Sequence, residues 1–212
     1  MKSLLEFLAH NRAEIFTATI EHLWLVGASM LAAVIVGIPL GIVVARRPWL
    51  GKPILGSANI AETIPSLALF GFLLPVPWLG DRADRLAIAA LALYALLPII
   101  RNTATGIVGV DPRVREAARA MGMTDYQILF QVEMPLAFSY ILAGVRVAAV
   151  LTIGIATIAA AVGAGGLGEF IFRGLAMVDN RLILAGAIPA AALALGADFL
   201  LSVLERRFQY AR

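Results

Sequence analysis

The sequence predicts an all-helical protein that crosses a lipid bilayer about five times. Hydrophobic residues make up 61% of the 212 residues, and the mean hydropathy is +0.89. Charged residues make up 15%, against about 25% in soluble domains. A chain this small has too much surface for its volume to bury so many apolar side chains in a water-soluble fold. The composition therefore argues against a soluble enzyme and a disordered chain, and places the apolar excess in a membrane.

Stretches with few charges locate the spans, because a helix needs about 20 mostly apolar residues to cross about 30 Å of hydrocarbon. Five such stretches carry at most one charge each. The third is the shortest and reaches full length only if its helix continues through Arg101; otherwise every later segment would be inverted. We expect one domain over residues 1–212, with spans near 20–45, 55–79, 86–106, 136–162 and 182–204.

The distribution of Lys and Arg predicts the orientation of the chain. With five spans, ten of these residues fall on one side of the membrane and six on the other, with Arg146 inside a span. Because cytoplasmic loops are enriched in Lys and Arg, we expect the ten-residue side to be the cytoplasm. The N-terminus is then outside and the C-terminus inside.

The longest polar stretch, the loop over residues 107–135, lies on the predicted cytoplasmic side between spans three and four. Asp111 is a suitable N-cap, Pro112 a suitable first helical residue, and Gly122 a suitable C-terminal stop. We therefore expect one short helix outside the bilayer. Small alanines flanked by charges suit docking into a cleft on a partner protein; a helix lying idle on the membrane surface is the alternative.

Charged residues inside the spans are costly and usually face a cavity or another charge. Glu62 in span two and Arg146 in span four lie at similar depth, so we expect them to form an ion pair or to line a translocation path. Snorkelling of each side chain to the headgroups is the alternative.

Motifs for other functions are absent or unconvincing. The chain has no cysteine and no Gly-x-x-x-x-Gly-Lys-Ser/Thr phosphate loop, and its two histidines lack ligand spacing. Residues 163–168 match Gly-x-Gly-x-x-Gly, but no strand precedes them, so a dinucleotide site is rejected. No basic run interleaved with aromatics suggests nucleic-acid binding. We expect no cofactor, no metal, no nucleic-acid partner and no enzymatic activity in this chain.

The predicted cytoplasmic loop carries a recognisable motif. It reads Glu116-Ala117-Ala118, three residues, Gly122, nine residues, then Val132-Glu133-Met134-Pro135. This resembles the signature of permease subunits of ATP-binding-cassette (ABC) importers, which is Glu-Ala-Ala, three residues, Gly, nine residues, Ile-x-Leu-Pro. Val132 and Met134 are conservative departures, and the spacing matches throughout.

Further segments resemble the osmoprotectant branch of that family, the permeases for glycine betaine, carnitine and choline. They are residues 62–69, 101–103 and 165–171, and the resemblance covers roughly residues 15–208. It implies a pore-forming subunit of the bacterial cytoplasmic membrane that moves a small solute by alternating access. The implied partners are a cytoplasmic ATPase, a second permease subunit, an external solute-binding protein and membrane lipid.

The resemblance also assigns roles to residues. The implied ATPase-coupling residues are Arg115, Glu116, Ala117, Ala118, Arg119, Gly122 and Pro135. Arg115 and Arg119 are expected either to pair with acids on the partner or to stay solvated. An external gate, a flexible turn leading into a helix over residues 169–177, is expected to include Gly165, Gly166, Gly168, Glu169 and Phe170.

Three other functions remain as alternatives. One is an importer permease of the same class that carries an amino acid, methionine or a sulfonate. Another is a self-sufficient channel or secondary transporter, which would work without a cytoplasmic ATPase. The last is an intramembrane enzyme, for which the spans offer no paired acids, Ser/His pair or metal ligands.

Overall fold

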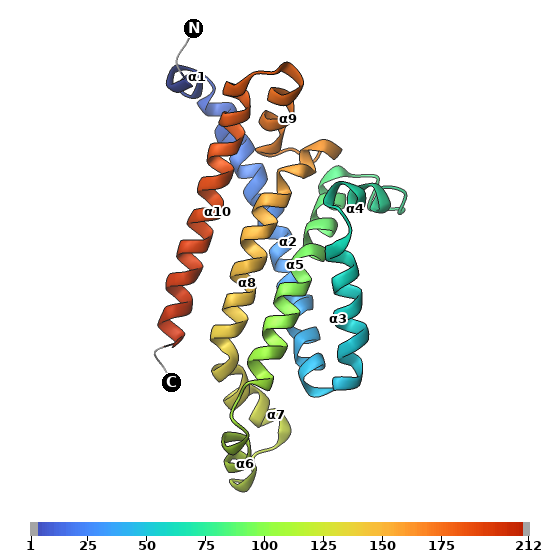
Figure 1. Cartoon of the computed structure of the whole chain (residues 1–212), viewed down its shortest axis with the longest axis vertical. Coiled ribbons are helices and arrows are strands. Elements are labelled where there is room, and N and C mark those ends of the chain that lie inside the picture. Colours follow the sequence, from blue (N-terminus) through green and yellow to red (C-terminus); the bar gives the residue numbers. More distant parts are fainter. Residues whose placement is uncertain (1–3, 210–212) are drawn as a thin grey trace.

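The computed structural model describes residues 4–209, and helices account for nearly all of them (Figure 1). Because lipid offers backbone groups no hydrogen bonds, helices are the expected way to cross it. The elements in chain order are α1 (Leu4–His10), α2 (Arg12–Arg46), α3 (Pro48–Thr63), α4 (Ser66–Leu73), α5 (Ala83–Val108), α6 (Pro112–Ala120), α7 (Asp125–Ile128), the π-helical turn η1 (Leu129–Glu133), α8 (Met134–Ala156), the 3-10 turn η2 (Ile158–Val162), α9 (Gly168–Met177) and α10 (Asn180–Gln209).

The long helices run side by side along the long axis of the molecule (Figure 1). Within residues 4–209, four stretches are long and apolar enough to cross a membrane: Arg12–Arg46, Ala83–Val108, Asp125–Ala156 and Asn180–Phe208. Helix α3 adds a further pass between the first two, so α1 and the last turn of α10 lie at opposite ends of the bundle (Figure 1). The predicted all-helical membrane fold is confirmed.

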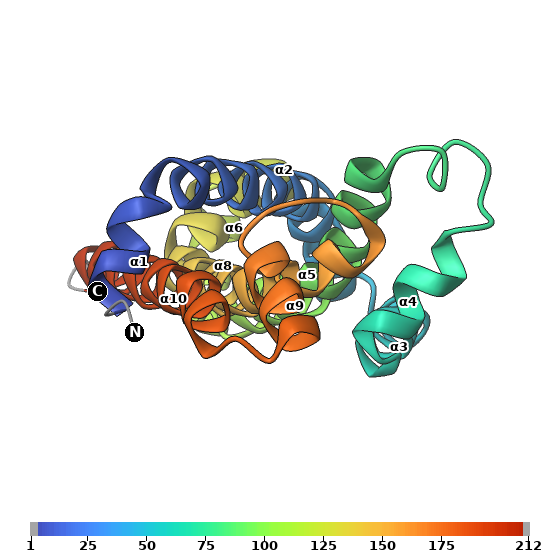
Figure 2. The same ribbon diagram turned by 90° about the horizontal axis from the view of Figure 1, so that it is seen from above.

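The second span differs from the predicted continuous helix over 55–79. Helix α3 starts earlier, at Pro48, and stops at Thr63; α4 then turns aside from its axis (Figures 1 and 2). Proline lacks a backbone N–H and disfavours helical backbone in the residue before it. Ile64, which precedes Pro65, is accordingly extended, with ψ at 128°. The hydroxyl of Tyr94 on α5 donates a hydrogen bond to the Ile64 carbonyl, which steadies the break.

The third span is a continuous helix, as predicted. Helix α5 runs from Ala83 to Val108 and continues through Arg101 without interruption. Arg101 donates a hydrogen bond to Asn59 Oδ1 on α3 at 3.0 Å, and Asn102 donates to the carbonyl of Pro98 at 2.8 Å. These hydrogen bonds satisfy the polar side chains of Arg101 and Asn102. The helix must continue through these two residues to be long enough to cross the membrane.

Glycines allow the central helices to approach closely. A Cβ placed on Gly41 of α2 would lie 2.5 Å from Thr103 Cβ on α5. A Cβ on Gly144 of α8 would lie 2.6 Å from Asn102 Cβ and 2.8 Å from the Pro98 carbonyl oxygen. Lipid tails are as apolar as core side chains, so membrane helices associate through this kind of close packing rather than through the hydrophobic effect. Helix α5 is thus held between α2 and α8, and it contributes the largest share of buried side chains.

We predict that Gly144→Ala weakens the packing of α8 on α5. The new methyl group must displace backbone as well as side-chain atoms, and overpacking of this kind costs about 1–3 kcal/mol of unfolding free energy. The measurement is the midpoint of thermal unfolding in detergent. Gly154→Ala is the matched control on the same helix, because a Cβ there meets nothing within 4 Å. Equal midpoints for both variants would contradict the packing argument.

Candidate functional site

Helix α6, at the same end of the bundle as the last turn of α10 (Figure 1), forms as its sequence predicts. The Asp111 carboxylate accepts a hydrogen bond from the Arg113 N–H at 2.8 Å, which caps the N-terminus. At the other end Gly122 adopts φ of +81°, a conformation that favours glycine. The Gly122 and Met123 N–H groups bond to the carbonyls of Arg119 and Ala118 at 2.9 and 3.1 Å. That pair of bonds is a Schellman motif, and it ends the helix.

The signature residues divide between two faces of α6. Glu116, Ala117 and Arg119 are exposed, whereas Ala118 is only 2% exposed. Large apolar side chains are also exposed on and near this helix: Val114, Met121, Tyr126 and Phe130. A surface that combines exposed apolar side chains with charges at this end of the bundle is suited to bind another protein.

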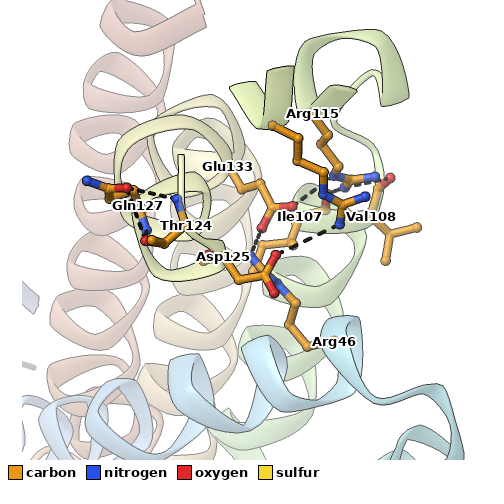
Figure 3. A network of polar contacts seen from close by, with 9 residues as sticks. Arg46, Ile107, Val108, Arg115, Thr124, Asp125, Gln127 and Glu133 are labelled. Carbon is orange, nitrogen blue, oxygen red and sulfur yellow. Dashed lines mark hydrogen bonds and ion pairs between the residues drawn. The ribbon is translucent and has the colours of Figure 1, made fainter. Parts of the chain in front are cut away.

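A buried carboxylate lies behind α6 (Figure 3). The Glu133 side chain is 5% exposed, and its two oxygens accept from different arginines. Oε2 lies 2.6 Å from Arg46 Nη2 at the end of α2, and Oε1 lies 2.8 Å from Arg115 Nε on α6. Arg115 also donates to the carbonyls of Ile107 and Val108 at the end of α5. We call Arg46, Glu133 and Arg115 the arginine–glutamate triad.

The backbone around Glu133 is a single widened turn. The Met134 N–H bonds to the Leu129 carbonyl, five residues back, and the next residue, Pro135, has no N–H to donate. Just before this turn, Thr124 and Gln127 form a capping box that starts α7. The turn thus joins the short helices outside the bundle to α8, and π-helical turns of this type are frequent at functional sites.

Sequence reasoning missed Glu133 because it occupies the unspecified position of the signature. The available signal was a lone acid inside an apolar run, next to two candidate cations on the same predicted side. Arg115 was expected to meet a partner or solvent, but the structure places it against Glu133. Arg119 remains exposed, with its guanidinium 3.9 Å from the carboxylate of Asp125, which is also exposed.

The expected ion pair between Glu62 and Arg146 is not formed among the described residues. Arg146 faces α10 instead, with Nε 3.6 Å from Asp198 Oδ1 and Nη1 3.5 Å from Glu205 Oε2. Glu62 lies in the last turn of α3, which packs against α2 and α5. Similar depth in the membrane was therefore a poor guide, because the two side chains lie on helices that do not face each other.

The predicted gate helix is α9, at the opposite end of the bundle from α6 (Figure 1). Gly165 and Gly166 before it have φ of +83° and +82°. Glu21 of α2 accepts a hydrogen bond from the Gly166 N–H at 3.1 Å. Glu169 is exposed and Phe170 is buried. A Cβ on Gly168 would lie 1.9 Å from the Thr157 carbonyl oxygen, so only glycine fits where α9 begins.

Two further contacts tie this end of the molecule to α2 and α10. Arg173 of α9 forms an ion pair with Glu14 of α2 at 2.6 Å. At the start of α10, the Arg181 side chain and N–H donate to Asp179, which precedes the helix, and these hydrogen bonds lower the pKa of that carboxyl below its ordinary value. The carboxylate therefore stays charged at neutral pH and caps α10.

Comparison with known proteins identifies the family. Residues 37–210 match the family described as binding-protein-dependent transport system inner membrane component. The chain belongs to this family, so it is a multi-pass permease of the inner membrane and a transport component rather than an enzyme. Membership of a binding-protein-dependent system implies an ATPase and a solute-binding protein as partners.

Several relatives match over nearly the whole chain. The osmoprotectant import permease OsmW of Salmonella typhimurium is 42% identical over 95% of this chain and 94% of its own length. The glycine betaine/carnitine/choline permease OpuCD of Bacillus subtilis is 44% identical over 97% of this chain and 89% of its own length. The carnitine permease OpuCB of Listeria monocytogenes is 41% identical over 98% and 94%.

Solved structures confirm the fold. A chain of the MetNI methionine ABC transporter in an inward-facing conformation superimposes with a TM-score of 0.82. The match covers 92% of this chain and 96% of that one, at 22% sequence identity. At that identity the likeness establishes the architecture of the permease and leaves the solute open.

We predict that Asp111→Ala frays the first turn of α6. Removing the cap costs about 1 kcal/mol, or about a fivefold increase in local opening. Hydrogen exchange measured by mass spectrometry should show faster exchange in residues 112–117 and unchanged exchange in α5. Asp81→Asn, at an exposed position at the other end of the bundle, is the control. Unchanged exchange in residues 112–117 would contradict the assigned cap.

Proposed function

We propose that this chain is the pore-forming permease of an ABC importer for quaternary-ammonium osmoprotectants such as glycine betaine, carnitine and choline. The observation that carries the proposal is the identity of about 40% over nearly the full chain to permeases named for these solutes. The cytoplasmic signature, with conservative departures only at Val132 and Met134 and with its Glu-Ala-Ala residues on the well-formed helix α6, supports it.

In this proposal α6 is the contact with the ATPase. The exposed face carrying Glu116, Ala117 and Arg119 sits in a groove on the ATPase, and Gly122 allows the chain to turn away from it. Pro135 starts α8 just beyond the widened turn. ATP binding closes the ATPase subunits and moves α6, which switches the permease between inward-facing and outward-facing states. The energy comes from the difference in ATP affinity between these two states.

The pathway is proposed to form between this chain and a second permease subunit, either an identical copy or a paralogue. Glu62 is exposed at the break in span two, and Arg146 is held by two acids on α10. Both are candidates to line the path, because charges at membrane depth favour water or protein over lipid. The gate on the outer side includes Gly165, Gly166, Gly168, Glu169 and Phe170. The N-terminus is proposed to lie outside and the C-terminus inside.

Another cargo, such as an amino acid, methionine or a sulfonate, is the alternative, because the shared fold by itself does not determine the solute. An uptake assay distinguishes the two candidate cargos. It uses liposomes that contain this chain, its ATPase and its binding protein. Osmoprotectant import predicts ATP-dependent uptake of labelled glycine betaine, carnitine or choline. Uptake of methionine alone would overturn the cargo, and uptake without the ATPase would overturn the importer mechanism.

We predict that Gly122→Asp lowers ATP-driven uptake at least tenfold. The substitution puts a charged side chain into open space beside the docking face, at a φ of +81° that an L-residue adopts at a cost. ATP hydrolysis in the same liposomes should fall less than uptake, because the spans and the ATPase are unchanged. Gly56→Ala, where a Cβ also meets nothing within 4 Å, is the control. Equal uptake by wild type and Gly122→Asp would count against the coupling role.

A further inference from the structure

We propose that Glu133 is a positioning residue that transmits the movement of α6 to the membrane-spanning helices. This inference rests on the proposed function, in which an ATPase moves α6. It assigns a mechanical role to a residue at the unspecified position of the family signature. It also gives Arg115 a different role from its neighbours on α6, since Arg115 faces into the protein.

Apolar packing alone does not attach α6 firmly. Ala118 is its only buried residue, and the helix packs chiefly against the four-residue helix α7. A methyl group contributes little contact area. A helix held only by Ala118 and by short connections at each end could change its orientation without moving the bundle.

The arginine–glutamate triad supplies the missing attachment. Arg115 extends from α6 to Glu133 at 2.8 Å, and Glu133 is held from the other side by Arg46 at 2.6 Å. Each guanidinium uses a different carboxylate oxygen, so neither arginine substitutes for the other (Figure 3). Charge-assisted hydrogen bonds of this length are the strong ones, and burial shields them from water.

The triad connects α6 to three spans at once. Glu133 belongs to the turn that leads into α8, Arg46 ends α2, and Arg115 also bonds to carbonyls at the end of α5. These are the helices that pack closely through Gly41 and Gly144. A displacement of α6 therefore acts directly on α2, α5 and α8, rather than being absorbed by the connections around Gly109 and Gly122.

A purely structural role would have different consequences. If the triad served only to keep the protein folded, its loss would lower assembly, ATP hydrolysis and uptake together. If it transmits movement, the complex still assembles and hydrolyses ATP, but fewer solute molecules enter per ATP. The ratio of uptake to hydrolysis separates the two roles.

The test uses the complete transporter in liposomes, with labelled choline as the transported probe. We expect Glu133→Gln, which keeps the shape and removes the charge, to lower uptake per ATP at least tenfold while the ATPase still co-purifies. Glu133→Asp keeps the charge on a shorter side chain and should recover part of this ratio. Asp81→Asn, the same kind of change at an exposed site, should leave it unchanged.

Arg115→Gln provides an independent test. The Arg115 side chain is partly exposed, so this variant does not place a neutral residue in the core. If the two residues act through each other, the double variant Glu133→Gln/Arg115→Gln should be no worse than the more impaired single variant. An unchanged ratio in both single variants, or a parallel loss of uptake and hydrolysis, would overturn the inference. If Glu133→Gln fails to assemble with the ATPase, the uptake per ATP of Arg115→Gln decides whether the inference holds.

The wild-type transporter in the same liposomes keeps this result separate from the proposed function. If wild type takes up choline with ATP and the Glu133 and Arg115 variants keep its coupling ratio, only the role of the triad falls. If wild type takes up none of the osmoprotectants, the proposed cargo falls, and the triad is then tested with the solute that is transported.

Discussion

One buried carboxylate, that of Glu133, joins the short helices to the bundle, because two arginines hold it from different elements. Taking a carboxylate out of water costs several kcal/mol unless its partners are well placed. Removing one partner of a fully buried pair costs about 3–5 kcal/mol; here the cost is smaller, because Glu133 has two arginine partners and both arginines are partly exposed. The arrangement therefore behaves as a unit: α6 cannot move independently of α2 and α8 without separating charges. An apolar contact could stabilise the fold equally well, but it would fix the direction of α6 less tightly.

The spans themselves are built for close but adjustable contact. Gly41 and Gly144 bring α2 and α8 onto α5, and this packing relies on van der Waals contact rather than on water exclusion. By contrast, α3 and α4 lie at the side of the bundle and break at Pro65 (Figure 2). The molecule thus combines a well-packed centre, linked to α6 through Glu133, with an interrupted helix at its edge.

Much of this could be predicted from sequence because the controlling signals are local. Asp111, Pro112 and Gly122 determine the bounds of α6 through capping and backbone conformation, and the charge-free stretches locate the spans. The break at Pro65 was harder to predict from the sequence, since proline is tolerated in many membrane helices. The partners of Arg146 and Arg115 could not be predicted, because they depend on which helix faces which. That arrangement is set by tertiary packing, and neither depth in the membrane nor position in a motif reveals it.

The central claim, that α6 is a cytoplasmic helix gripped by an ATPase, is tested most directly by chemical labelling at position 117. The chain contains no cysteine, so Ala117→Cys introduces a single reactive thiol at an exposed site. A membrane-impermeant maleimide should label it in inside-out vesicles and fail to do so in intact cells, and addition of the ATPase should protect it. Labelling from outside the cell, or labelling that the bound ATPase leaves unchanged, would contradict the account.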